Sequence, residues 1–192
     1  MVTKLSEEVF SSLSSQVQEY ILDLEHDVTH DQLTKVLTRS AFTEIASHEL
    51  LSLKREKDGS TLLLFFDVND FKSINDKYGH LAGDEVLKEI VKRFKFLLRE
   101  TDIIARYAGD EFIGLLDISN NKEAVNNILN KMMISTEIPL IFESKIIPFG
   151  ISLGAVILNK ETTSLNDAIK KADEAMYEAK KGKASGSKYV VF

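Results

Sequence analysis

Residues 62–76 read LLLFFDVNDFKSIND. The unbroken apolar run from Leu62 to Phe66 predicts a central strand that is buried on both faces. The strand ends at Asp67, and because ligands collect where a buried strand meets solvent, we expect this carboxylate to face a binding site. Residues 68–70 then form a short loop before a helix, whose first backbone N–H groups can bind phosphate.

A second acidic feature lies in residues 106–112, which read RYAGDEF. The adjacent carboxylates Asp110 and Glu111 occupy a glycine-containing turn between two apolar runs, a pattern typical of a β-hairpin. Adjacent carboxylates repel each other, and a divalent cation, which takes oxygen ligands, would relieve the repulsion. The alternative is an acidic turn that is only solvated, and the hairpin alone does not decide between the two.

The composition limits the class of protein. With 192 residues, 44% of them hydrophobic and 28% charged, the chain suffices for one globular domain and an additional helix. The net charge of −6 argues against a nucleic-acid polymer as partner, because such surfaces are broadly basic. The sequence has no apolar run long enough to cross a membrane, no secretory signal and no cysteine, which fits a reducing cytoplasm.

An amphipathic helix is predicted over residues 5–28, where apolar residues recur at steps of three and four. They are Leu5, Val9, Leu13, Val17, Tyr20, Leu24 and Val28. We expect this stripe to contact a second copy of the chain; the alternative is that it packs on its own domain. The helix joins Asp31 without an intervening Gly or Pro, so it could pass a movement onward as a stiff rod.

The remaining elements alternate between strands and helices. Helices are predicted over 40–57, from about 71, and over 81–99, 121–135 and 164–181, with Gly79 as the break between the second and third. Strands are predicted over 61–67, in the hairpin, twice within 139–158 around a turn near Glu143, and over 188–192. This order predicts an α/β (α+β) fold with a mostly antiparallel sheet flanked by helices and a ferredoxin-like core.

These residues resemble the GGDEF family of bacterial diguanylate cyclases from about Asp31 to Val191. The resemblance rests on ordered segments: DQLT at 31–34 with Arg39 and Phe42, FDVNDFKSIND at 66–76, GHLAGD at 79–84, RYAGDEF at 106–112, ISLGA at 151–155 and ADEAMYEAK at 172–180. It implies a palm-type nucleotidyl-cyclase core. We therefore divide the chain into a signalling or dimerisation helix, residues 1–30, and a GGDEF domain, residues 31–192.

The resemblance also implies a reaction. Two GTP molecules would condense to cyclic di-GMP and two pyrophosphates, with Mg²⁺, or Mn²⁺ in its place, held by Asp67, Asp110 and the carbonyl of Val68. Either Asp110 or Glu111 would accept the proton of the attacking hydroxyl. Because one site holds one GTP, two chains would have to face each other as a homodimer, controlled by an upstream sensor domain or a partner protein.

The same resemblance implies that further residues bind the substrate: Phe71, Lys72, Asn75, His80, Asp84 and Lys180. An ionised Asp84 only accepts hydrogen bonds, so it can pair with the N1–H and N2–H₂ donors of guanine, which adenine does not offer together. The alternatives are an N-cap role for Asp84, a structural role for His80, and solvated surface charges for the two lysines.

Arg99 and Asp102 match the family's inhibitory Arg-x-x-Asp motif, so we expect cyclic di-GMP to bind there and inhibit. The alternative is an arginine at a helix end followed by an aspartate in a turn. The supporting arginine that is usual in the next helix is replaced by Asn130 and Lys131.

The sequence departs from the family pattern at several positions. Ala108 replaces the first glycine of the signature, Asn69 stands where Asp is common, and Lys35, Thr38 and Ser40 replace the usual Gly, Asn and Arg. After Lys180 the expected Gly-Arg-Asn is shifted to residues 182–184. We expect activity to survive these changes; the alternatives are a catalytically silent receptor for cyclic di-GMP and a cyclase that makes a mixed or monocyclic nucleotide.

Overall fold

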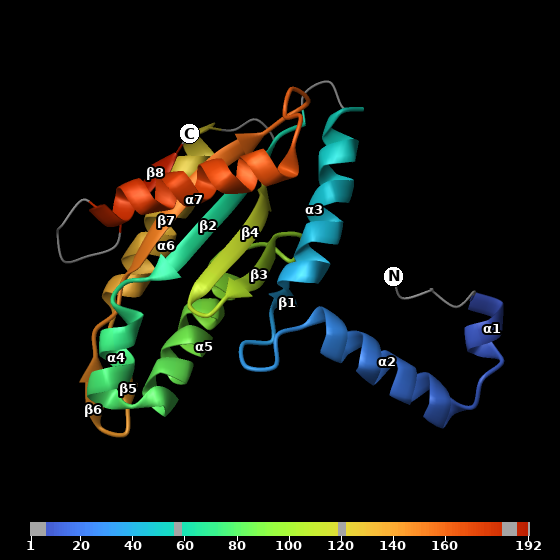
Figure 1. Ribbon diagram of the computed structural model, residues 1–192, viewed down its shortest axis with the longest axis horizontal. Helices are drawn as coiled ribbons and strands as arrows, with labels where there is room; N and C mark the ends of the chain where they lie inside the picture. Colours follow the sequence, from blue (N-terminus) through green and yellow to red (C-terminus); the bar gives the residue numbers. More distant parts are fainter. Residues whose placement is uncertain (1–6, 56–58, 119–121, 182–187, 192) are drawn as a thin grey trace.

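The computed structural model describes residues 7–55, 59–118, 122–181 and 188–191. Figure 1 shows a central sheet with helices on both faces. Its six strands lie in the order β1-β3-β4-β2-β7-β8, and β2 pairs antiparallel with both β4 and β7. The outer pairs β1–β3 and β7–β8 are parallel. The strands span Leu37–Thr38 (β1), Thr61–Val68 (β2), Ile103–Ala108 (β3), Glu111–Asp117 (β4), Ile151–Leu158 (β7) and Lys188–Val191 (β8).

Helices cover both faces of this sheet, so the predicted α/β fold with a mostly antiparallel sheet is confirmed. The helices span Glu7–Ser11 (α1), Ser15–Thr29 (α2), Arg39–Leu53 (α3), Phe71–Tyr78 (α4), His80–Leu97 (α5), Lys122–Glu137 (α6) and Leu165–Lys181 (α7). Every residue of β2 is buried, as its apolar run predicts. Leu62, Leu64 and Phe66 share a core with α5 and α6, and Leu63 and Phe65 share one with α3 and α7. In the part of the chain that is described, no helix is long and apolar enough to cross a membrane.

Helix α7 lies unusually close to the sheet because β7 has a glycine beneath it. A Cβ atom at Gly154 would lie 2.0 Å from the carbonyl oxygen of Ala172 and 2.3 Å from the backbone nitrogen of Met176. Both are backbone atoms of α7, so any side chain at position 154 would push the helix away. The close approach brings the C-terminal half of α7 over the end of β2.

The prediction of one helix over residues 5–28 was wrong, because α1 ends at Ser11 and α2 begins at Ser15. The Ser12 hydroxyl donates to the Val9 carbonyl, and Gln18 Nε2 donates to the carbonyls of Phe10 and Leu13. Serine side chains compete in this way for backbone groups that a continuous helix would use. The exposed apolar residues of α2 do not pack on the sheet, which α2 leaves at an angle (Figure 1).

Two further differences concern short strands. Residues 139–158 hold three strands, not two, since the hairpin β5 (Leu140–Phe142) and β6 (Lys145–Ile147) forms a separate sheet before β7. The turn lies where it was predicted, with Glu143 and Ser144 both at positive φ. The two-residue strand β1 was not predicted, because two residues carry no periodic pattern.

The segment that follows α2 is tied to the β3–β4 hairpin by one aspartate. Asp31 Oδ1 accepts hydrogen bonds from the backbone N–H and the hydroxyl of Thr34 at 2.8 and 2.6 Å, and lies 3.1 Å from Arg106 Nη1 on β3. Lys35, where glycine is usual, has a φ of 56° in the same turn. This left-handed conformation strains a lysine. The hydrogen bonds and the ion pair of Asp31 therefore stabilise the turn in spite of the backbone strain at Lys35.

Asp31→Asn tests this tie. Burial raises the pKa of Asp31, but hydrogen bonds from Thr34 and the nearby Arg106 outweigh it and lower the pKa below its ordinary value of 3.8. A lowered folded-state pKa stabilises the fold above the unfolded pKa, and the contribution is lost as pH falls through the folded pKa. We expect the variant to lose about 1–2 kcal/mol of unfolding free energy at about pH 7.

Urea unfolding of both proteins between about pH 7 and pH 3 measures the difference, which should shrink toward the acid end. Glu44→Gln, on the exposed side of α3, is the matched control and should cost nothing. A loss from Asp31→Asn that does not change with pH would contradict a role for the carboxylate charge.

Candidate active site at the end of the central strand

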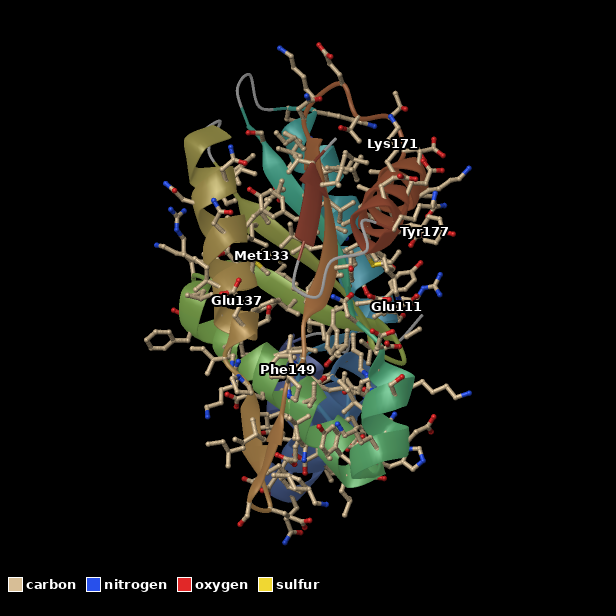
Figure 2. All side chains as sticks on the ribbon, turned by 90° about the vertical axis from the view of Figure 1, so that its left-hand side faces the viewer. Glu111, Met133, Glu137, Phe149, Lys171 and Tyr177 are labelled. Carbon is tan, nitrogen blue, oxygen red and sulfur yellow. The ribbon has the colours of Figure 1, made fainter. Side chains whose placement is uncertain are left out.

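Two of the predicted acidic residues lie side by side at the end of the sheet. In the β2–β4 register Asp67 is the direct partner of Glu111, so their side chains leave the same face. This is the face covered by α3 and α7, since Phe65 and Ile113, two residues away, belong to that core. Asp110 lies in the turn just before Glu111. Figure 2 shows Glu111 between α4 and the part of α7 that carries Tyr177.

Asp67 is buried, with 5% of its surface exposed, and its two oxygens differ. Oδ2 forms an ion pair with Nζ of Lys180, in the last turn of α7. Oδ1 is fully buried and has no hydrogen-bond partner among the described residues. Burial raises the pKa of Asp67, and the charges of Asp110 and Asp173 add to it, which outweighs the opposing effect of Lys180. The site therefore carries an unsatisfied anionic oxygen, which a cation would satisfy.

Asp173 was not predicted as a site residue, although it lies near Glu111. Burial raises the pKa of Glu111, and the neighbouring carboxylates, Asp173 first, raise it further. Asp173 precedes Lys180 by seven residues, or two helical turns, so the two occupy one face of α7. That spacing, together with the assignment of Lys180 to the site, is the sequence signal that could have identified Asp173.

Burial lowers the pKa of Lys180, but its hydrogen bond to Asp67 and the charges of Asp67, Asp110 and Asp70 outweigh burial and raise it. The ammonium therefore stays protonated and offsets part of the carboxylate charge. Asp70, in the loop after β2, also adopts a left-handed φ of 52° just before α4.

These oxygen donors fit a divalent cation whose remaining coordination positions would be filled by phosphates of a bound nucleotide. In the described part of the chain, no group of three His, Asp or Glu side chains could hold a metal without help. Mg²⁺ rarely uses such a cage and is more often bound by one or two carboxylates together with substrate phosphates. Asp67, with its unpartnered Oδ1, and Asp110 meet that requirement, and Val68 follows Asp67 directly on β2.

The residues that were predicted to bind the guanine base lie on helices α4 and α5, which meet at Gly79. Gly79 has a φ of 91° and ends α4 while it caps the N-terminus of α5. Asp84 lies within α5, so the alternative that it serves as an N-cap was wrong. Asn75 is half-buried, and its Oδ1 is fully buried and without a hydrogen-bond partner in the described structure. Lys72 and His80 are exposed on the same pair.

Ala108, the departure from the family signature, causes no strain in the turn. The residue that needs a left-handed conformation is Gly109, with a φ of 48°, and Ala108 has no positive φ. Arg106 Nε donates to the Gly109 carbonyl at 2.8 Å, and Nη1 of the same guanidinium reaches Asp31. One arginine thus links the end of the N-terminal segment to the turn that carries Asp110.

Asn69, the second departure, anchors the loop that follows the central strand. Its backbone N–H donates to the Gly150 carbonyl at 2.9 Å, and its Oδ1 accepts from the Ser152 hydroxyl at 2.7 Å. Asn69 therefore holds the loop to β7, a contact that does not depend on a carboxylate.

Arg99 and Asp102 lie at the opposite end of the hairpin from Asp110. The six residues of β3 separate the two places by about 20 Å. Asp102 Oδ2 accepts from the Arg99 backbone N–H at 2.8 Å and Oδ1 accepts from the Asp117 N–H at 3.3 Å. Asp102 therefore shapes the turn, as the structural alternative proposed, while the Arg99 residue is exposed.

Comparisons with known proteins agree with this geometry. The family model for the diguanylate cyclase GGDEF domain matches residues 28–185. The chain is 37% identical over 154 residues to diguanylate cyclase DgcP from Pseudomonas aeruginosa, an alignment that covers 79% of this chain and 22% of that protein. It is 28% identical over 170 residues to the cyclic di-GMP phosphodiesterase NbdA of the same organism, covering 88% of this chain and 22% of that protein.

Among solved structures, the GGDEF domain of TpbB from Pseudomonas aeruginosa superposes with a TM-score of 0.77 and 32% identity, covering 84% of this chain and 93% of that domain. The chain spans about a fifth of the length of the two curated relatives. Because the family model extends over most of the chain, and its sheet carries the acidic turn where that family has its signature, this protein belongs to the GGDEF family.

Proposed function

We propose that this chain is a diguanylate cyclase that joins two GTP molecules into cyclic di-GMP and releases two pyrophosphates. The observation that carries the proposal is the convergence of Asp67, Asp110 and Glu111 at one end of the sheet, around a carboxylate oxygen that lacks a partner. Such a concentration of negative charge destabilises a folded protein. A domain that only binds a nucleotide elsewhere has no physical need for it.

In this proposal Asp67, Asp110 and the Val68 carbonyl hold Mg²⁺, or Mn²⁺ in its place. The bound ion would neutralise the triphosphate and make the ribose 3′-hydroxyl easier to deprotonate. Glu111 accepts the proton of that hydroxyl. It lies opposite Asp67 in the register, next to the proposed metal ligand Asp110, where it can act as a general base.

Lys180 exchanges partners in the reaction cycle. Without substrate its ammonium pairs with Asp67, and with GTP bound it pairs with phosphate oxygens, which carry more negative charge. Lys72 adds a second positive charge in the first turn of α4, where backbone N–H groups also face an incoming phosphate. Transfer between phosphoryl groups depends on this positioning and charge neutralisation.

The base lies against α4 and α5. Asp84 accepts hydrogen bonds from N1–H and N2–H₂ of guanine, and Asn75 contributes a further hydrogen bond. Phe71 and His80, the first residues of α4 and α5, border the same site. A site built on such hydrogen bonds leaves polar groups unpaired when adenine binds, which is why it favours GTP.

Two chains must act together, because each offers one site and the reaction joins two nucleotides. Helix α2 supports this proposal, since its apolar stripe is exposed: Tyr20 at 64% and Val28 at 60% of their surfaces. A second copy of the same helix would bury the stripe. Catalysis per chain should then fall when the enzyme is diluted.

A second function is favoured by one observation. Arg99 is exposed beside the turn that Asp102 organises, at a place far from the acidic site. An arginine can bind a phosphate or a guanine edge with two hydrogen bonds. We therefore propose that cyclic di-GMP binds there and inhibits; a silent receptor would keep this binding without making the product.

The cyclase proposal is tested by incubating the wild-type chain with GTP and Mg²⁺ and identifying the product by mass spectrometry. We expect cyclic di-GMP and pyrophosphate, with a rate per chain that rises with protein concentration. Asp110→Asn and Glu111→Gln should each lower kcat by about 100-fold or more, because they remove a charge but keep the shape of the turn.

Glu174→Gln is the matched control, because Glu174 is an exposed carboxylate on α7; its rate should equal that of the wild type. Binding of cyclic di-GMP without any turnover of GTP would refute the cyclase and support the receptor. Conversion of GTP to a different cyclic nucleotide would refute the proposed product.

Lys180→Met should change metal and nucleotide binding in opposite directions. Removing the ammonium leaves Asp67 free for a cation, so we expect Mn²⁺ to bind the nucleotide-free chain more tightly, by about tenfold if about 1.4 kcal/mol of competition is removed. GTP should bind more weakly, because a phosphate contact is lost. Electron paramagnetic resonance of free Mn²⁺ and calorimetry with GTP measure the two affinities, and a fall in both would show that the ammonium does not compete with the cation.

Arg99→Ala should relieve product inhibition without changing the initial rate. We expect the inhibition constant for cyclic di-GMP to rise by about tenfold or more, the loss typical of a charge-assisted pair. Lys92→Ala, which removes an exposed cation on α5, is the control and should be inhibited by cyclic di-GMP as the wild type is. Unchanged inhibition of the Arg99 variant would place the inhibitory site elsewhere.

A further inference from the structure

The contact between Asn75 on α4 and Gly83 on α5 is closer than any other side chain at position 83 would allow. An added Cβ at Gly83 would lie 1.9 Å from Asn75 Oδ1, 3.0 Å from Asn75 Cγ and 3.2 Å from Phe71 Cζ. The amide oxygen thus occupies the space where nearly every other amino acid has its first side-chain atom.

The backbone does not explain this glycine. Gly83 is buried within α5 and has no positive φ, so the conformation suits alanine, which forms helices better than glycine does. The α5 backbone would gain from a methyl group at this position. The space taken by the Asn75 amide is the feature that opposes the change.

The close contact also sets the direction of the amide. Oδ1 is fully buried against Gly83, where a Cα–H group is a weak donor. Nδ2 lies on the other branch of Cγ and is not one of the buried, unpartnered atoms of the described residues. The amide therefore turns its N–H donors away from Gly83, while the next residue on α5, Asp84, supplies an acceptor.

We propose that Gly83 is a specificity-determining position, whose missing side chain fixes the Asn75 amide with its donor turned toward a guanine base. The inference rests on the proposed function, because it presumes that α4 and α5 bind the base. The inference goes beyond the proposed function because it explains the orientation of the Asn75 amide by a residue that does not itself touch the nucleotide. Gly83 is a positioning residue.

A methyl group at Gly83 should displace the amide and leave the fold intact. The nearest atom is the end of a short, movable side chain, so rotation of Asn75 relieves the clash more easily than separation of the helices. Gly83→Ala should therefore bind guanine nucleotides more weakly and keep its weak binding of adenine nucleotides.

The experiment compares wild type, Gly83→Ala, Asn75→Ala and the double variant. Calorimetry with Mg²⁺ and 3′-deoxy-GTP or 3′-deoxy-ATP measures binding of nucleotides that cannot react. We expect Gly83→Ala to weaken the binding of 3′-deoxy-GTP by at least about tenfold and to leave the binding of 3′-deoxy-ATP unchanged. In the Asn75→Ala background it should cause no further loss of 3′-deoxy-GTP affinity. Leu81→Ala, an exposed position in the same turn, is the control and should bind as the wild type does.

Thermal unfolding supplies a readout that does not involve nucleotide. Gly83→Ala should lower Tm in the wild-type background, because of the clash with Asn75. It should raise Tm in the Asn75→Ala background, where only the tip of the Phe71 ring, 3.2 Å away, has to shift slightly and the methyl favours the helix. Equal shifts in both backgrounds, or unchanged 3′-deoxy-GTP binding, would overturn the inference. A wild-type chain that binds no 3′-deoxy-GTP would refute the proposed function itself, so the two failures can be told apart.

Discussion

Carboxylates repel one another at the buried end of β2, and the surrounding structure has to hold them together against this repulsion. Asp67, Asp110, Glu111 and Asp173 share one end of the sheet, and Lys180 contacts Asp67 there. Burial raises the pKa of both Asp67 and Glu111, so keeping them ionised weakens the fold. A bound cation would offset that cost, which would couple cation binding to relief of the repulsion among these carboxylates.

The scaffold holds this charge because β2 lies in the middle of the sheet. It pairs along its whole length with β4 and β7 and is buried by helices on both faces. Two glycines then bring helices closer than side chains would permit: Gly154 lets α7 carry Asp173 and Lys180 over the sheet end, and Gly83 lets α5 meet the Asn75 amide. Arg106 joins the turn before Asp110 to Asp31, so a change in the N-terminal segment has a direct contact through which to reach Asp110.

Several parts of the structure were predictable because their signals are local. The apolar run before Asp67 and the glycine-containing turn at Gly109 gave β2 and the hairpin their correct places, and Gly79 marked the break between α4 and α5. The break at residues 12–14 was missed, because the apolar stripe continues across it and only the serine and glutamine hydrogen bonds reveal it. Within residues 139–158 two strands were predicted where the structure has β5, β6 and β7, because a strand of three residues resembles the end of a longer strand.

The family, the central strand, the acidic turn and the types of residue in the candidate site could all be read from the amino-acid sequence, because each depends on neighbours along the chain. The folded chain was needed to show which oxygen of Asp67 is unpartnered, that Lys180 pairs with the other, that Asp173 belongs to the same cluster, and that Asn75 points its oxygen at Gly83. Charge and close packing act through space, between atoms as far apart in the chain as residues 67 and 180. No local pattern of amino acids encodes those distances.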